Sequence, residues 1–265
     1  MKLKSIAFLA GALAASAAIA DTEVIIGFTQ VNSPNKNTIV GIPYTNLEGG
    51  NVTVADFVKT SGLLAGDKCY AMSTTAGLYD AWELVADGSG VLSWSPVSQV
   101  QMLANGTVTV TTSPTAAETT LAPGSALWIV REGDNRAYAT PFYVMGKMAT
   151  TTDYPSSTIA AATTDGEKTV GTWSLVANCG PAAKSIEWLM GKFGDNVATG
   201  DKIVMPADSN NGLGQTWNYR GSSLGWSGKS DSKSNTMIQP GMGVWVYNLK
   251  TEAITVDWVE AEASK

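Results

Sequence analysis

The chain carries one strand-like stretch twice: Leu121-Ala122-Pro123-Gly124-Ser125-Ala126-Leu127-Trp128-Ile129-Val130 returns as Ile238-Gln239-Pro240-Gly241-Met242-Gly243-Val244-Trp245-Val246-Tyr247. An earlier stretch, residues 38–43, recurs in the same order as residues 174–179. The offsets run from roughly 117 to 136 residues, which is the length of a small domain and far longer than a solenoid unit. The sequence therefore predicts two related halves that arose by internal duplication.

Strands dominate the predicted secondary structure of both halves. Gly, Pro, Thr, Ser and Asn are dense throughout, and the apolar runs between them are short and rich in β-branched or aromatic residues. Such runs bounded by turn formers are typical of strands. We expect a mostly β fold with two β-sandwich or barrel-like halves, residues 21–145 and 146–265. A Thr-, Ala- and Ser-rich segment, residues 149–171, is the expected linker or long loop between them.

Helix is expected in only two short segments, residues 54–59 and 185–190. Phe57 and Trp188 are their expected buried anchors. An apolar stretch ending in glycine precedes each copy, at residues 24–27 and 143–146, so a leading strand could belong to the sheet of the neighbouring half. Residues 107–111 alternate valine with threonine and predict a strand with one wet face.

Residues 1–20 have the pattern of a secretory signal peptide. Lys2 and Lys4 precede a short apolar stretch, and a small-residue cleavage site ends it at Ala20. An uncleaved anchor is the alternative. No later segment is long and apolar enough to be an expected bilayer span. We therefore expect an exported chain (periplasmic, outer-surface or extracellular) with no membrane insertion after cleavage.

The charge of the chain argues against nucleic acid as a partner. Without Lys2 and Lys4, 15 basic residues remain against 23 acidic ones, a net charge of −8. Nucleic-acid binding requires clustered cations, and only three arginines occur. An anionic membrane surface would repel the chain for the same reason.

The two cysteines, Cys69 and Cys179, fall in different copies. An oxidising compartment would permit a disulfide between them, but they do not occupy equivalent positions in the repeat. Two buried free thiols are the alternative.

The chain contains no histidine, which excludes histidine-based catalytic triads, dyads and metal sites. No phosphate-binding or dinucleotide motif is present, so no cofactor or metal is expected. Chemistry by carboxylates stays open, and the repeat offers one symmetric pair, Asp67 and Asp201. Glycosidases and acid peptidases use two facing carboxylates. The alternative is structural, because Gly-Asp-Lys is an ordinary tight turn entering a strand.

Nine tryptophans give the clearest indication of function, because sugar-binding proteins stack exposed rings on their ligands. Trp128 and Trp245 stand in strands that are apolar on both faces, so we expect them in the core. Trp94 and Trp226 follow glycine- and serine-rich turns and are candidates for exposure. Tyr79 and Tyr219 stand beside polar residues and complete the candidate ligand-binding set.

The paired motifs resemble a recurring pattern in uncharacterised secreted proteins of Verrucomicrobia-type bacteria. The early motif is Ile39-Val40-Gly41-x-Pro43, and the late motif is Leu121-x-Pro123-Gly124-x-Ala126-x-Trp128-Ile129. The second copy keeps the late motif but departs from the early one at residues 179–181. The resemblance covers most of the mature chain. It implies export and a β-rich duplicated fold, and it assigns no active site.

These observations lead to one functional hypothesis and one alternative. The hypothesis is a secreted, non-catalytic module of the cell envelope or extracellular space, binding a glycan or a surface protein through exposed aromatic rings. The alternative is a secreted hydrolase, glycosidase or acid peptidase, that works through carboxylates.

Overall fold

The computed structural model describes residues 26–259 except 34–36, 49, 61, 74–77, 103–107, 134–139, 148–153, 207–213 and 229–232. Strands account for 46% of the structure and helices for 8%, which confirms the predicted mostly β fold. The two short helices, α1 (Val54–Thr60) and α2 (Ile186–Lys192), lie where the sequence predicts them. Neither helix in the described part of the chain has the length and apolar character needed to span a membrane. The expected signal segment, residues 1–20, lies outside the described residues.

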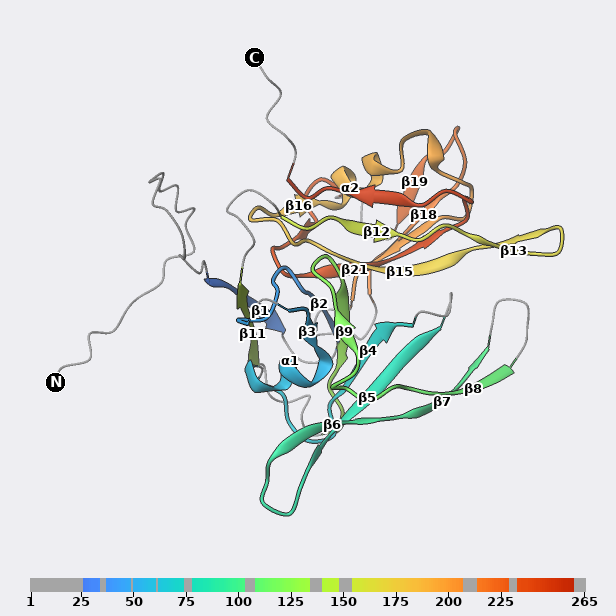
Figure 1. The fold of residues 1–265 in the computed structure, drawn as a ribbon. Helices are drawn as coiled ribbons and strands as arrows, with labels where there is room; N and C mark the ends of the chain where they lie inside the picture. The colour runs from blue at the N-terminus through green and yellow to red at the C-terminus, as the bar shows by residue number, and fades with distance from the viewer. Residues whose placement is uncertain are drawn as a thin grey trace.

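Two open, antiparallel five-stranded sheets form the framework, and both have the same strand order (Figure 1). The first sheet has the order β2-β10-β4-β5-β6, and the second β15-β21-β17-β18-β19. The repeated stretch of the sequence supplies β10 and β21, the second strand of each sheet. Internal duplication stays a prediction, to which the shared strand order adds support. The bounds are β2 (Asn37–Gly41), β10 (Ala126–Val130), β4 (Lys68–Met72), β5 (Tyr79–Ala86), β6 (Leu92–Pro96), β15 (Thr172–Ala177), β21 (Gly243–Asn248), β17 (Lys202–Val204), β18 (Thr216–Tyr219) and β19 (Trp226–Gly228).

Smaller strand pairs occur at equivalent places in the two halves. Each helix follows directly on a two-residue strand that pairs with the strand before the repeated Pro-Gly turn. In the first half β3 (Val52–Thr53) pairs with β9 (Thr120–Leu121), and in the second β16 (Lys184–Ser185) pairs with β20 (Met237–Ile238). A 3-10 turn, Gly194–Asn196, follows α2.

In each half, the first strand pairs with the last strand of the same half. β1 (Ile26–Ser33) pairs with β11 (Thr140–Lys147), and β12 (Ser157–Ile159) pairs with β22 (Ile254–Val256). Gly27 lies directly opposite Gly146 in the first of these pairs. The stretch that leads the second copy in sequence therefore belongs structurally to the first half, and the first half extends to Lys147.

Among the described residues, each half also contains one hairpin that the other lacks. In the first half it is β7 (Ser98–Met102) with β8 (Val108–Thr112), and in the second it is β13 (Thr163–Asp165) with β14 (Lys168–Val170). The interpretation of residues 149–171 as a linker or long loop is therefore corrected, because β12 and the β13–β14 hairpin occupy its described part. Threonine is a good strand former, and these strands are too short to stand out in a polar sequence.

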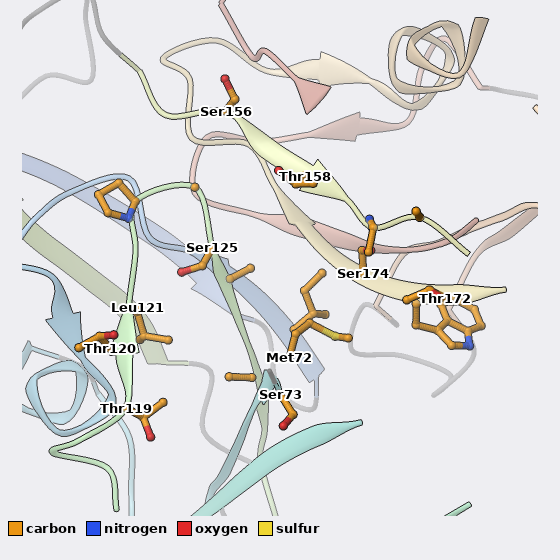
Figure 2. Close-up of a pocket in the computed structure, with 18 residues that line it drawn as sticks. Met72, Ser73, Thr119, Thr120, Leu121, Ser125, Ser156, Thr158, Thr172 and Ser174 are labelled. Atoms are coloured by element: carbon orange, nitrogen blue, oxygen red, sulfur yellow. The ribbon is translucent and has the colours of Figure 1, made fainter. Parts of the chain in front are cut away.

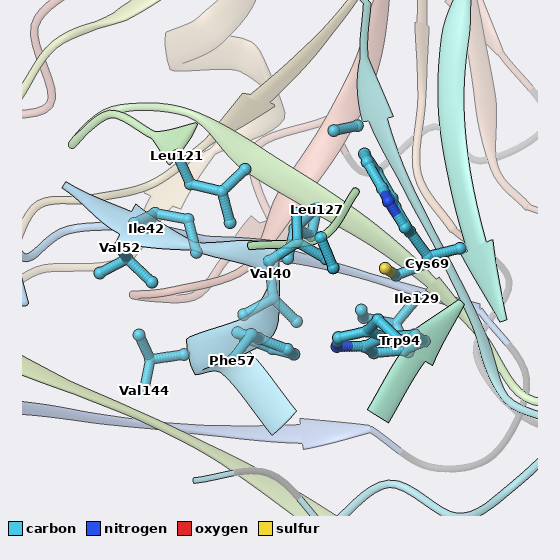
Figure 3. Close-up of a cluster of buried hydrophobic side chains, with 14 of the residues drawn as sticks. Val40, Ile42, Val52, Phe57, Cys69, Trp94, Leu121, Leu127, Ile129 and Val144 are labelled. Atoms are coloured by element: carbon cyan, nitrogen blue, oxygen red, sulfur yellow. The ribbon is translucent and has the colours of Figure 1, made fainter. Parts of the chain in front are cut away.

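Each half has its own hydrophobic core. In the first half, α1 and β11 cover one face of the sheet, and Phe57, Trp82 and Trp94 are buried there with Leu127 and Ile129 (Figure 3). The second core contains Trp217, Trp258, Phe193 and Val246 against α2 and β22. Trp82 and Trp217 occupy equivalent positions in the repeat and are fully buried.

A third apolar cluster joins the two halves and is built from repeated residues. Trp128 and Trp245 meet there edge to face, with their ring centroids 4.8 Å apart. They are only partly buried. The expectation that they are core residues is therefore corrected, because both lie between the halves. The two halves also approach each other closely at small residues, because a Cβ added at Gly41 would lie 2.7 Å from the Cβ of Ala177.

Candidate binding groove

Trp94, the first of the predicted ligand-binding residues, is buried with 6% of its surface exposed. It stands opposite Leu84 in the β5–β6 pair and points into the core of the first half (Figure 3). The expectation that Trp94 is exposed is wrong, because the alternation of side chains along β6 turns the ring inward. A ligand cannot stack on it.

Trp226 and Tyr219 are brought together by the structure. They stand directly opposite each other on β19 and β18, with ring centroids 5.6 Å apart. Trp226 also packs edge to face on buried Phe193 at 5.2 Å. Both rings are half-buried at the free edge of the second sheet, which leaves a limited aromatic surface there.

Tyr79 does not join that pair. It lies between the halves, 6.4 Å from the ring centroid of Trp128, and it is hydrogen-bonded to the Trp245 side chain. Burial raises the pKa of Tyr79 to about 12, although the bond to Trp245 acts in the opposite direction. Its ring is therefore part of the contact between the halves.

Asp67 and Asp201, the candidate carboxylate pair, are fully buried in separate turns. The Leu64 amide donates to Asp67 Oδ2 at 2.9 Å, and the Ala198 amide donates to Asp201 Oδ2 at 2.7 Å. Burial raises the pKa of Asp201, against hydrogen bonds from two backbone amides. Both carboxylates hold their own Gly-Asp-Lys turn together, so they do not face each other across a cleft.

Cys69 and Cys179 are free thiols, each buried in a different hydrophobic core. The candidate disulfide is therefore corrected to the alternative of two buried thiols. Among the described residues, no three His, Cys, Asp or Glu side chains gather as metal ligands would.

The two thiols give a prediction about reactivity and pH. Burial raises the pKa of Cys179 from an ordinary 9.0 to about 12, and it also raises that of Cys69. A thiol-specific reagent at about pH 8 should leave both unmodified in the native protein and modify two per chain after unfolding without reductant. A raised folded pKa contributes stability below pH 9.0 that is lost as the pH rises toward about 12. One or no titratable thiol in the unfolded chain would contradict the assignment.

A groove of about 530 Å³ opens between the two halves (Figure 2). Its first-half wall is the turn between β9 and β10 with the end of β4, and its second-half wall is β12 and β15. Serine and threonine supply eight of the 18 lining residues that the structure describes, and none of these 18 side chains is ionisable. The lining residues are Ala71, Met72, Ser73, Thr119, Thr120, Leu121, Pro123, Gly124, Ser125, Ala126, Ser156, Thr158, Ala160, Ala161, Thr172, Trp173, Ser174 and Leu175.

Buried hydrogen bonds fix the base of the groove. Ser157 is 1% exposed, and its hydroxyl oxygen lies 3.1 Å from the carbonyl oxygen of Gly124 and 2.9 Å from that of Ala177. The same hydroxyl accepts a hydrogen bond from Trp258 Nε1 at 3.0 Å. Ser157 thus ties β12 to both halves at once, and the flanking Ser156 and Thr158 line the groove.

Trp173 is the aromatic residue of the groove, and sequence reasoning missed it. The ring is partly exposed and packs on Tyr247 at a centroid distance of 5.0 Å. By alignment of the repeats, the first half has Asn37 in place of Trp173 and Val130 in place of Tyr247. An aromatic pair that occurs in one copy of the repeat only is the sequence signal that points to this position.

Ser125 and Met242 occupy equivalent places in the repeat but differ in what they contact. Met242 packs on the core of the first half and forms an isolated β-bridge with Val40. Ser125 lines the groove, and its hydroxyl donates to the Ala122 carbonyl of its own turn at 2.6 Å. The short serine side chain leaves open the space that a methionine would fill.

The described lining of the groove offers hydroxyl groups and one aromatic ring, and none of its side chains is ionisable. Its hydroxyls donate and accept hydrogen bonds, and Trp173 offers an apolar ring face. Two carboxylates lie beside the groove without lining it: Asp257 accepts a hydrogen bond from the Ser156 hydroxyl, and Asp80 is hydrogen-bonded to Ser73. No known protein family, curated protein or solved structure matches the chain.

Proposed function

We propose that this protein is a non-catalytic binding module of the cell envelope or extracellular space, and that it holds an uncharged glycan in the groove between its halves. The observation that carries the proposal is the lining itself, with eight hydroxyl residues, one partly exposed tryptophan and no ionisable side chain. Sugars present hydroxyls around an apolar ring face, and both find partners here. Export is part of the proposal and rests on the signal-like residues 1–20.

The size and rigidity of the groove support a defined ligand. A volume of about 530 Å³ falls within the range of roughly 300–1,000 Å³ that is usual for small-ligand sites. The Ser157 hydrogen bonds hold the wall in place before a ligand arrives, which reduces the ordering cost of binding. A charged ligand would find no counterion among the lining residues.

The hydrolase alternative has no support of this kind. It requires two facing carboxylates, whereas Asp67 and Asp201 are each enclosed in a turn, and neither lines the groove.

Trp173→Ala is expected to weaken glycan binding by about ten- to a hundredfold, because it removes a stacking face worth roughly 1–3 kcal/mol. The ligand is first identified with a glycan array of neutral and acidic oligosaccharides. Affinity is then measured by isothermal titration calorimetry. Loss of binding in Trp226→Ala and Tyr219→Ala, with normal binding in Trp173→Ala, would move the site to the edge of the second sheet.

Ser125→Met provides a second test, which adds a side chain instead of removing one. We expect it to abolish binding by filling the groove, as Met242 fills the equivalent space on the other side of the contact. Thermal unfolding should stay close to that of the natural protein, because the space is open to solvent. Undiminished glycan binding by this variant, or the absence of any retained glycan at high concentration, would contradict the proposal.

A further inference from the structure

The β7–β8 hairpin exposes its apolar side chains and turns its polar ones inward. Val100, Val108 and Val110 are 73%, 62% and 70% exposed. The threonines and glutamines that alternate with them are half-buried. The predicted wet face is therefore the valine face, the reverse of the usual arrangement on a half-buried strand.

Hydrogen bonds to β5 fix this orientation. The Tyr79 amide donates to Gln101 Oε1 at 2.9 Å, and Gln101 Nε2 donates back to the Tyr79 carbonyl at 2.7 Å. Gln99 Nε2 donates to the same carbonyl at 3.1 Å. Turning the hairpin over would break all three bonds, because a one-residue change of register exchanges the two faces.

The exposed face is continuous, and within the described part of the chain the hairpin that carries it occurs in the first half alone. Val100 lies directly opposite Val110 across the hairpin, and Val108 follows on the same face. Such an apolar face is a general mark of an interaction surface.

The charge distribution favours a second copy of this chain as the partner. Residues 88–117 contain no ionisable side chain, whereas the whole chain has a net charge of −6. Two copies of an acidic protein repel each other wherever charged surfaces meet, and the valine face brings no like charges together. The hairpin also lacks the lysines and prolines with which proteins commonly prevent contact between exposed strands.

We propose that the valine face docks on the valine face of a second copy of this chain. A two-fold axis would place the same three valines on both sides of the contact, with the two hairpins packed face to face. Three side chains cover far less than the ~800 Å² per partner of a stable interface. The association is therefore weak and grows with concentration, as suits copies held close together at a surface.

Sedimentation equilibrium from ~10 µM to ~1 mM tests this proposal, with a shift from monomer to dimer as the expected result. The triple variant Val100→Thr, Val108→Thr, Val110→Thr keeps β-branched side chains and should weaken the dimer on the order of a hundredfold. Val110→Lys should abolish it by placing like charges at the contact. The matched control Val91→Thr with Leu224→Ser removes exposed apolar side chains elsewhere and should associate normally.

Three outcomes would overturn the proposal. They are a monomer at every concentration, a triple variant that associates like the natural protein, and a monomer that binds neutral lipid vesicles through the same valines. Circular dichroism establishes that the variants are folded. Glycan binding reports separately on the groove, because β7 and β8 do not line it, so either proposal can fail without the other.

Discussion

Arg131→Ala is expected to lower the free energy of unfolding by about 3–5 kcal/mol, because it leaves the buried Asp67 carboxylate without its cation. Arg131 and Asp67 are 1% and 0% exposed, with 3.7 Å between Nη1 and Oδ2. Arg131 Nη2 also donates to the Gly62 carbonyl at 3.1 Å, so the substitution removes a second partner. Urea denaturation followed by tryptophan fluorescence measures the loss.

The second half provides the matched control for this prediction. Asn248 stands where the repeat places Arg131, and it donates to the Ala160 and Glu252 carbonyls. Asp201 accepts instead from the Leu249 amide at 2.8 Å. Asn248→Ala removes neutral hydrogen bonds only and should cost about 1–3 kcal/mol.

A double variant separates the charge from the packing. Asp67→Asn with Arg131→Met removes both charges and keeps much of the side-chain volume, so it should be more stable than Arg131→Ala alone. Equal losses in Arg131→Ala and Asn248→Ala, or a double variant that is less stable than Arg131→Ala, would show that the buried charge does not dominate.

The β-rich fold could be predicted from the sequence because its strands carry local signals. Residues 126–130 and 243–247 are runs of aliphatic and aromatic residues that follow Pro-Gly turns. Each run forms the second strand in the order of its sheet. The two short helices also follow local rules, since Ser185 caps α2 by accepting from the Trp188 amide at 3.0 Å. Local chemistry is sufficient for elements of this kind.

The position of the aromatic rings could not be predicted in the same way. A strand that is apolar on both faces looks the same whether its second face packs in one core or against another half, as at Trp128 and Trp245. The turn before Trp94 favours exposure of its ring, but the register of β6 decides it. Register depends on pairing partners distant in sequence.

The groove had no local signal because its walls come from separate segments of both halves. Ser73, Thr120, Ser156 and Thr172 are ordinary polar residues in the sequence, and only the packing of β12 against the first half brings them to one surface. Departure from the repeat was the remaining clue. Trp173 and Ser125 both occupy positions where the two copies differ in chemistry.

Gly124→Ala is expected to have the second large effect, because this glycine is where β12 docks on the first half. Its φ is +93°, and a Cβ would lie 2.2 Å from the Ser156 carbonyl oxygen. The left-handed backbone alone costs an alanine about 1–2 kcal/mol. Displacement of the neighbouring backbone should add about 1–3 kcal/mol, measured by urea denaturation.

Gly90→Ala isolates the backbone term of that prediction. Gly90 has a similar φ of +82°, but an added Cβ would meet nothing within 4 Å. The difference between the two variants therefore measures how firmly β12 is held against the turn at Gly124. Because Ser157 fixes the base of the groove from this strand, Gly124→Ala should also weaken glycan binding, whereas Gly90→Ala should not. Equal stability losses would mean that β12 moves freely, and a preformed groove would then be wrong.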